Sequence, residues 1–187
     1  MSASELGRFA EIVRSGGVVL IPTDTVYGVA AALARIVEAK GRDPRKPCQL
    51  LASGVAAVER LGLATGPCAR AVMEAFWPGA LTLVLDAPGG GTEGARVPAH
   101  EAARALCEAA GGLLRCTSAN RSGEKPAVSA EEAAAALPSA DALVDAGPSP
   151  GGVSSTVAAV SADGSVRMFR EGPIGRAALE AAATNRA

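Results

Sequence analysis

The stretch from Gly16 to Gly28 constrains the fold more than any other part of the chain. Its residues 18–21 are four consecutive apolar side chains between a glycine pair and Pro22, a pattern typical of a short, fully buried strand. Three hydroxyls and a carboxylate follow at once, from Thr23, Asp24, Thr25 and Tyr27. Such a cluster is either a polar turn that caps the next helix or the edge of a ligand site, and these residues alone leave both interpretations open.

Apolar runs and helical periodicity alternate along the rest of the chain. A capping box formed by Ser2 and Glu5 predicts an opening helix. Further helices are predicted over 30–40, 55–63, 67–76, 101–110, 129–137 and 174–183, and strands over 18–21, 50–52, 81–85, 113–116, 143–144, 154–157 and 166–170. Because strands both alternate with helices and pair as apparent hairpins near 81–98 and 155–170, we predict an α/β (mixed α+β) fold with a mixed sheet.

Length and charge narrow the class of protein. The 187 residues predict one domain over 1–187. A net charge of −1 argues against a surface devoted to nucleic acid or anionic membrane, and the apolar runs are too short to span a bilayer. The four cysteines are widely spaced and there is one histidine, so we expect buried thiols rather than a Cys/His metal site. A cytoplasmic protein with no membrane association is therefore predicted.

Polar residues recur where predicted strands end, at 23–27, 117–120, 154–156 and 170. In layered α/β proteins such ends converge on one crevice, which is where ligands bind. The candidate basic wall of this crevice comprises Lys40, Arg42, Arg45, Lys46, Arg96 and Arg170, and its candidate neutral hydrogen-bonding groups are Ser118, Asn120 and Ser155. Cations with amides and hydroxyls suit a nucleoside triphosphate, although the charge run over 40–46 alone is more typical of a solvated surface.

Familiar catalytic motifs are missing from this chain. There is no P-loop, and the spacing Gly89-x-Gly91-x-x-Gly94 follows a strand without opening a helix, which favours a plain hairpin loop. His100 has no serine or cysteine partner near it in sequence. Catalysis would then rest on positioning and on stabilising negative charge at phosphorus, as in nucleotidyl or phosphoryl transfer.

Seven short motifs, in order, resemble those of the threonylcarbamoyl-AMP synthase (YrdC-type) family. They are Pro22-Thr23-Asp24-Thr25-Val26-Tyr27-Gly28, Lys40-Gly41-Arg42, Trp77-Pro78-Gly79-Ala80-Leu81-Thr82, Arg96-Val97-Pro98-Ala99-His100, Ser118-Ala119-Asn120-x-Ser122-Gly123, Ser155-Thr156-Val157 and Arg170-x-Gly172. The resemblance runs from about residue 5 to residue 180 and is to the short form of the family. It implies a YrdC-like twisted mixed sheet, flanked by helices, around a large basic concave cavity.

The resemblance also implies an activity, namely the condensation of L-threonine, bicarbonate and ATP into L-threonylcarbamoyladenylate and pyrophosphate for the threonylcarbamoyladenosine modification of tRNA. Catalytic residues would be Lys40, Arg42, Ser118 and Asn120; ATP would contact Arg42, Lys46, Ser118, Asn120 and Arg170; and threonine would contact Thr23, Thr25, Tyr27, Arg96 and Ser155. Mg²⁺ is expected with ATP, and no organic cofactor. The expected partner is a downstream threonylcarbamoyl-transferase complex, with tRNA reached only indirectly.

Three departures from the family pattern accompany the resemblance. The connection from Gly28 to Lys40 is short, Cys48-Gln49 replaces a common apolar pair, and Leu51 stands where many members have a histidine.

Two other functions stay open. One is a related carbamoyl-adenylating domain that uses carbamoyl phosphate, and the other is a module that binds double-stranded RNA or tRNA through its basic surface.

Overall fold

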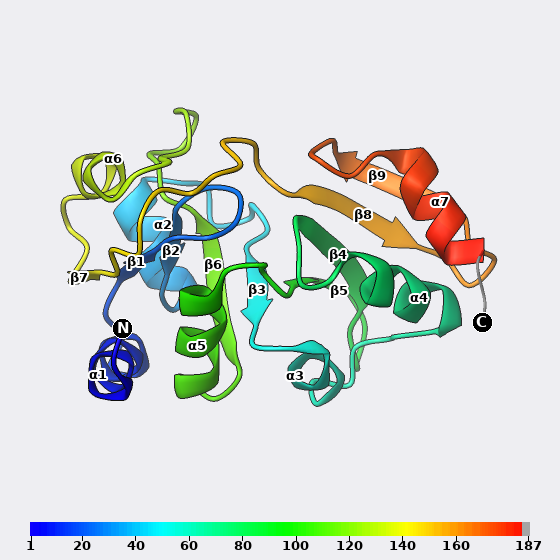
Figure 1. Cartoon of the computed structure of the whole chain (residues 1–187), viewed down its shortest axis with the longest axis horizontal. Helices are drawn as coiled ribbons and strands as arrows, with labels where there is room; N and C mark the ends of the chain where they lie inside the picture. The colour runs from blue at the N-terminus through cyan, green and yellow to red at the C-terminus, as the bar shows by residue number, and fades with distance from the viewer. Residues whose placement is uncertain (185–187) are drawn as a thin grey trace.

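The computed structural model describes residues 1–184 and is organised around one mixed sheet (Figure 1). Its strands are β1 (Val19–Ile21), β2 (Gly28–Ala30), β3 (Gln49–Ala52), β4 (Leu81–Asp86), β5 (Thr92–Arg96), β6 (Leu113–Ser118), β7 (Ala142–Leu143), β8 (Thr156–Val160) and β9 (Val166–Arg170). They lie in the order β7-β1-β2-β6-β3-β5-β4-β8-β9. The pairs β1–β7, β3–β5 and β4–β8 are parallel and the other neighbours antiparallel, which confirms the predicted α/β fold with a mixed sheet.

The helices are α1 (Ala3–Arg14), α2 (Leu33–Lys40), α3 (Val55–Glu59), α4 (Pro67–Phe76), α5 (Glu101–Ala109), α6 (Ala130–Ala136) and α7 (Arg176–Thr184). The predicted capping box at the start of α1 is confirmed, because the Ser2 hydroxyl accepts from the backbone N–H of Glu5 and the Glu5 carboxylate accepts from the backbone N–H of Ser2. Within residues 1–184, no helix is long and apolar enough to cross a membrane.

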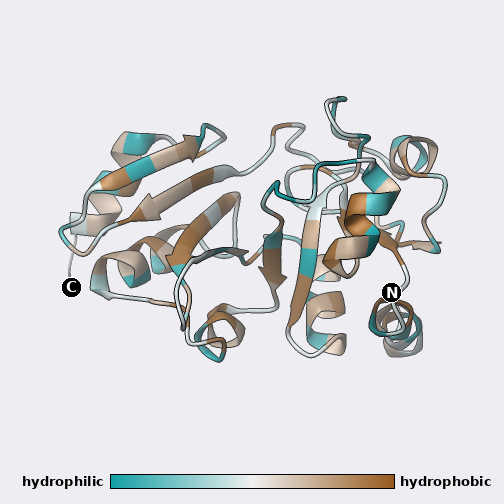
Figure 2. Ribbon diagram, turned by 180° about the vertical axis from the view of Figure 1, so that it is seen from behind, coloured by the Kyte–Doolittle hydropathy of each residue, from teal (hydrophilic) through white to brown (hydrophobic). Residues whose placement is uncertain are grey.

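Helices cover the two halves of the sheet differently (Figures 1 and 2). On the half that contains β1, β2 and β6, helices α1 and α5 pack against one face and α2 and α6 against the other. On the half that contains β4, β5 and β8, helices α3, α4 and α7 pack against one face. The opposite face of that second half carries the polar residues discussed below, so the fold leaves a sheet surface open to a ligand.

The segment after Gly28 differs from the prediction. Residues 28–30 form β2 between β1 and β6, and the helix predicted over 30–40 begins only at Leu33. Three residues are too few to show the period-two pattern of a strand, which is why β2 was missed. A Cβ on Gly28 would lie 2.6 Å from Cys116 Sγ, so glycine lets β2 approach β6 closely.

Other predicted boundaries shift by a few residues. Helix α3 ends at Glu59, before Gly62 with its positive φ of 69°. Strand β6 extends through Ser118 because its polar end pairs with β2. The strand predicted to begin at 154 begins at 156, and the helix predicted to begin at 174 begins at 176. The hairpin predicted around 81–98 is confirmed as antiparallel β4–β5, with β5 starting inside the predicted loop, and all four cysteines are buried as predicted.

Candidate functional site

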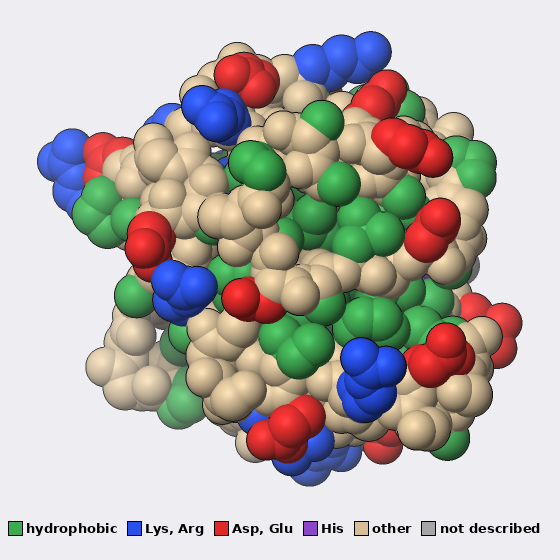
Figure 3. Space-filling view, turned by 90° about the vertical axis from the view of Figure 1, so that its left-hand side faces the viewer, with side chains coloured by type: hydrophobic (Ala, Val, Ile, Leu, Met, Phe, Trp, Pro, Cys, Tyr) green, Lys and Arg blue, Asp and Glu red, His purple; other side chains and the backbone are tan. Residues whose placement is uncertain are grey.

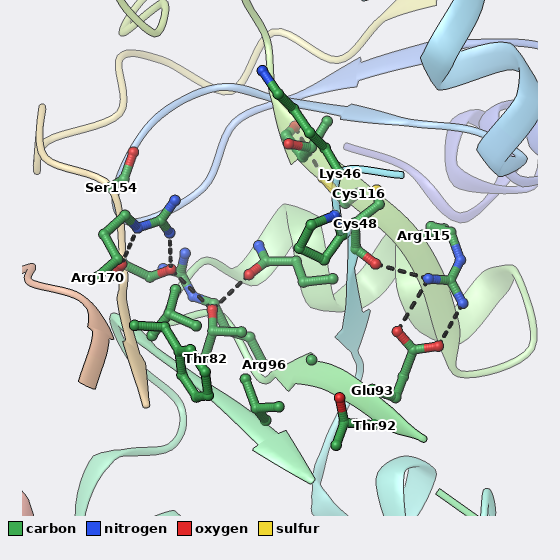
Figure 4. Close-up of a pocket in the computed structure, with 18 of the residues that line it drawn as sticks. Lys46, Cys48, Thr82, Thr92, Glu93, Arg96, Arg115, Cys116, Ser154 and Arg170 are labelled. Atoms are coloured by element: carbon green, nitrogen blue, oxygen red, sulfur yellow. Dashed lines mark hydrogen bonds and ion pairs between the residues drawn. The ribbon is translucent and has the colours of Figure 1, made fainter. Parts of the chain in front are cut away.

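A cavity of about 830 Å³ lies on the sheet face that α3, α4 and α7 leave uncovered (Figure 4). Successive side chains of β4 point to opposite faces of the sheet. Thr82 and Val84 therefore line the cavity, whereas Leu81 and Leu83 lie in the core on the other face. A much smaller pocket of about 20 Å³ shares Thr25, Val26, Gln49, Arg96, Cys116, Thr117 and Ser118 with the cavity. The two spaces therefore meet along these shared residues.

Arg96 is the most tightly held cation of the site. Its Nε donates to the carbonyl of Gly79 at 2.9 Å, one Nη donates to Thr25 Oγ1 at 2.9 Å, and the other pairs with the Asp24 carboxylate at 2.6 Å. Arg96 is only 2% exposed; burial lowers the pKa of its guanidinium, and Asp24 opposes that shift. A guanidinium has five N–H donors, and three of those of Arg96 are engaged by the described residues, while the side chain lines both pockets.

The polar cluster over residues 23–27 forms a turn, and part of it lines the cavity. Thr23 Oγ1 donates to the carbonyl of Val26 at 2.6 Å and accepts from the backbone N–H of Thr25 and Val26, so Thr23 closes the turn. This turn leads into β2 and not into a helix. Thr25 lines both pockets, and its hydroxyl lies 3.0 Å from that of Thr23. Thr25 therefore forms the cavity edge that Thr23 supports.

Tyr27 borders the small pocket but is fully buried. Its hydroxyl donates to the carbonyl of Gly147 at 2.8 Å, and burial raises its pKa to about 12. The side chain thus anchors the loop before β8 while its hydroxyl is committed to the backbone. Of the five residues predicted to contact threonine, Thr25, Arg96 and Ser155 line the large cavity, and Thr23 and Tyr27 line only the small pocket.

Ser155 and Arg170 meet at the opposite side of the cavity. Arg170 Nε donates to the carbonyl of Ser155 at 3.0 Å, and its Nη2 donates to Ser155 Oγ at 3.1 Å. The register of β8 with β9 shifts between Val157 and Ala158, and such a bulge turns two successive side chains toward one face. Phe169 and Arg170 both line the cavity as a result.

Lys40 and Asn120 lie behind the cavity wall. The Lys40 ammonium donates to the backbone carbonyls of Ser118 and Asn120, the second at 2.5 Å, and lines neither pocket. Burial and the neighbouring Arg42 lower its pKa to about 8. The Asn120 amide nitrogen donates to the carbonyls of Arg121 and Glu124 at 2.7 and 2.9 Å. Both side chains thus fix the segment that follows β6, from which Ser118 reaches the cavity.

Arg42 and Lys46 come from the charged run after α2. Arg42 Nη1 donates to Thr117 Oγ1 at 3.3 Å and its Nη2 to the carbonyl of Pro47 at 3.1 Å, and its buried Nε has no hydrogen-bond partner among residues 1–184. Arg42 lines neither pocket, whereas Lys46 lines the cavity and is exposed. Lys46 Nζ lies 3.3 Å from Ser122 Oγ, its only close partner in the described part of the chain. The charged run over 40–46, which was predicted to be solvated, therefore also reaches the edge of the cavity through Lys46.

Several cavity residues were not predicted as site residues. Thr82 and Gln49 are joined by a hydrogen bond of 2.5 Å, and Arg115 forms a two-point ion pair with Glu93 at the cavity edge, with distances of 3.1 and 2.7 Å (Figure 4). Asp24, the partner of Arg96, was noted only as part of the polar cluster over residues 23–27. Thr82 and Asp24 fall inside quoted motifs, which was a usable signal, whereas nothing in the sequence pairs Arg115 with Glu93.

The arrangement combines a side pocket of about 20 Å³ with a wide cavity edged by cations. The six cationic side chains that line the cavity favour anionic oxygens, and they are Arg45, Lys46, Arg96, Arg115, Arg167 and Arg170. In residues 1–184 no cluster of three or more His, Cys, Asp or Glu side chains is placed to hold a metal ion. The cavity is therefore suited to a ligand with several anionic oxygens.

Comparisons with known proteins place the chain in a family. A sequence model of the Sua5/YciO/YrdC family, described as telomere recombination, matches residues 11–172. A threonylcarbamoyl-AMP synthase of Bacillus subtilis is 36% identical over 197 residues, which cover 95% of this chain and 56% of that protein. A putative threonylcarbamoyl-AMP synthase of Mycobacterium tuberculosis is 36% identical over 178 residues, which cover 87% of this chain and 81% of that protein.

A solved structure extends the comparison to the fold. The crystal structure of P. abyssi Sua5 complexed with L-threonine superposes with a TM-score of 0.89 at 30% identity, over 100% of this chain and 59% of that one. The chain therefore spans little more than half the length of the Bacillus subtilis relative and of the Sua5 chain, at 56% and 59%.

Proposed function

Because this chain belongs to the Sua5/YciO/YrdC family, we propose that its cavity condenses L-threonine, bicarbonate and ATP into L-threonylcarbamoyladenylate and pyrophosphate. The observation that carries this proposal is the junction of the two pockets at Arg96, which has two N–H donors left after binding Asp24, Thr25 and Gly79. The relatives named as threonylcarbamoyl-AMP synthases support it, as does the complex of Sua5 with L-threonine.

In the proposed reaction the two remaining N–H groups of Arg96 bind the threonine carboxylate, and Thr25 Oγ1 accepts a hydrogen bond from the amino acid. The deprotonated amine attacks the carbon of bicarbonate, so that a C–N bond forms, water leaves and a carbamate results. One carbamate oxygen then forms a bond to the α-phosphorus of ATP, and the bond from that phosphorus to the pyrophosphate oxygen breaks.

The outer cations would hold the triphosphate. Lys46 and Arg170 line the cavity and are exposed. Lys46 can reorient toward phosphate oxygens, and Arg170, which is held by Ser155, would present its remaining N–H groups to them, so that both offset charge on the departing pyrophosphate. Ser118 supplies a neutral hydroxyl at the same wall. Arg42, Lys40 and Asn120 are proposed to act by holding this wall in place, with Arg42 close enough to the 117–118 backbone to turn toward a bound phosphate.

Mg²⁺ is proposed to enter as part of the substrate, bound to the triphosphate. The carboxylates that line the cavity are Asp86 and Glu93, and Glu93 is already paired with Arg115. Phosphate oxygens would therefore supply most ligands of the ion. We further propose a cytoplasmic location and transfer of the product to a threonylcarbamoyl-transferase complex, without direct contact between tRNA and this chain.

The test is a turnover assay on the purified protein with MgATP, bicarbonate and single amino acids, measuring pyrophosphate and an adenylylated product. We expect threonine-dependent release of pyrophosphate. If release depends on carbamoyl phosphate and not on threonine, the alternative carbamoyl-adenylating function is correct.

The RNA-binding alternative gains little from the face at the left-hand end of Figure 1. Lys and Arg side chains alternate with Asp and Glu over the face at the left-hand end of Figure 1, without a continuous basic area (Figure 3). A phosphate backbone is attracted by clustered positive charge, and the net charge here is −1. Tight, salt-dependent binding of tRNA by this chain in the absence of ATP would revive that function.

A further inference from the structure

Four side chains form a continuous hydrogen-bond chain across the cavity, from β9 to β3 (Figure 4). The distances are 3.1 Å from Arg170 Nη2 to Ser155 Oγ, 2.9 Å from Ser155 Oγ to Thr82 Oγ1, and 2.5 Å from Thr82 Oγ1 to Gln49 Oε1. Ser155 and Thr82 are each 2% exposed. Two buried hydroxyls thus connect an arginine at one side of the cavity to an amide at the other.

The hydrogen bond at the Gln49 end fixes the direction of this chain. Thr82 Oγ1 donates its one proton to Gln49 Oε1. In its contact with Ser155, Thr82 is therefore the acceptor, and Ser155 Oγ in turn accepts from Arg170, whose guanidinium only donates. The amide oxygen of Gln49 is thus the acceptor, so the amide nitrogen Nε2 points away from Thr82. Nε2 has no hydrogen-bond partner among residues 1–184.

Gln49 stands at the junction of the two pockets. It lines both of them, together with Arg96 and Ser118. Its backbone is the first residue of β3, which pairs with Cys116 of β6, so the side chain projects from a regular strand and not from a loop. The Gln49 side chain therefore stands among the residues that the two pockets share, and its amide oxygen is already engaged by Thr82.

We propose that Gln49 is a further catalytic residue, whose Nε2 donates to a non-bridging oxygen of the α-phosphate of ATP; this inference rests on the proposed function. During attack the carbamate loses negative charge while the phosphoryl oxygens retain it, so a donor that accelerates the step belongs on phosphorus. Thr82 is then a positioning residue, which acts by orienting the Gln49 amide. Gln49 is one of the departures from the family pattern quoted above, so the resemblance does not supply this role.

The kinetic test compares Gln49→Met, which keeps the length of the side chain and removes both donors, with wild type. Loss of a transition-state donor typically costs about 100-fold or more in kcat, so we expect a fall of about 100-fold in kcat for pyrophosphate release, with the KM for ATP changed less than about threefold. Thr82→Val should lower kcat about 10-fold, and Thr82→Ser should restore most of it. A merely structural role would lower the thermal midpoint of Thr82→Val without this split between kcat and KM.

A binding measurement keeps the two proposals distinguishable. Gln49→Glu replaces the donors by a carboxylate of the same shape, so the affinity for MgATP measured by calorimetry without threonine should fall at least about 10-fold. If wild type shows no threonine-dependent turnover, the proposed function fails and this binding comparison alone decides the role of Gln49. A folded Gln49→Met variant with wild-type kcat, or a Gln49→Glu variant with unchanged affinity for MgATP, overturns the inference.

Discussion

The inner and outer parts of the cavity hold their cations in opposite ways. In the inner site, formed by Asp24, Thr25 and Arg96, the guanidinium is 2% exposed and bound on three sides. In the outer site, formed by Lys46, Ser118 and Arg170, both cations are exposed, and the only close partner of Lys46 within residues 1–184 is one hydroxyl.

This difference indicates which kind of ligand each part of the cavity can bind. A buried, fully oriented arginine has already lost its side-chain freedom, so a small ligand binds it at little further cost in entropy. Exposed lysine and arginine side chains keep their rotamers and reach a longer, flexible polyanion in several ways. The inner site is therefore built for one geometry and the outer site for adjustment during the reaction.

Arg96→Ala is the change that should separate the two sites most. It leaves the Asp24 carboxylate, which is 14% exposed, without its partner, and breaking a buried pair costs about 3–5 kcal/mol. We expect a loss of that size in the free energy of unfolding measured with urea, together with loss of turnover. Arg170→Ala is the matched control from the outer site and should cost less than about 1 kcal/mol. Equal losses in both variants would contradict the distinction.

Lys40→Met tests whether the wall behind the cavity is held by a buried ammonium. Losing hydrogen bonds from a charged donor to the carbonyls of Ser118 and Asn120 should lower the free energy of unfolding by about 2 kcal/mol. Burial lowers the Lys40 pKa from 10.5 to about 8, so between these values the unfolded chain binds the proton more strongly, and the contribution of Lys40 to stability rises with pH.

Denaturation of wild type and Lys40→Met from pH 7.5 to 10 checks the sign of this pH dependence. The stability difference between them should widen in favour of wild type above pH 8, by at most about 1.4 kcal/mol per pH unit. If the stability difference between wild type and Lys40→Met narrows as the pH rises, the site stabilises the charged form of Lys40 and does not destabilise it.

Arg42→Ala should affect turnover far more than folding. Its Nη groups contact Thr117 and Pro47 at 3.3 and 3.1 Å, and its Nε has no partner within the described residues, so we expect a loss of stability below about 1 kcal/mol. Threonine-dependent release of pyrophosphate should nevertheless be lost, because Arg42 would no longer hold the wall at Thr117 or turn toward a bound phosphate. A wild-type rate of pyrophosphate release in this variant would contradict the role proposed for Arg42.

Lys46→Ala should have the smallest effect of the four. Since the side chain is exposed, the free energy of unfolding should change by less than about 0.5 kcal/mol. The KM for ATP should rise about 3- to 10-fold, with a smaller rise at high salt because an exposed charge is screened. Lys125→Ala, at an exposed position that lines neither pocket, is the matched control.

Parts of the site could be predicted because their residues lie next to buried strands. Thr25 and Ser118 come at or near the end of an apolar run, Ser155 directly precedes β8, and the structure brings all three to one cavity. The sheet type could be predicted for the same reason, from apolar runs with breakers between them. Strand β2 could not, since its three residues pair through the backbone and leave no pattern in the side chains.

Contacts between distant residues were beyond prediction. Lys40 was predicted in the basic wall of the crevice, yet it is 5% exposed and lies behind that wall because the carbonyls of residues 118 and 120 turn toward it. Gln49 was noted only as a departure from a family pattern, because a single polar residue at the start of a strand does not indicate which neighbours its side chain will meet. Both placements depend on hydrogen bonds to segments more than 30 residues away.

The alternation along β4 has a consequence for how the protein reaches its native state. A slip of one residue in the pairing of β4 with β5 would turn Leu81 and Leu83 into the cavity and Thr82 into the apolar core. No misregistered chain could therefore retain the binding surface. A ligand that binds only the native state shifts the folding equilibrium toward it. A ligand of the cavity would therefore stabilise the correctly paired sheet relative to misregistered chains.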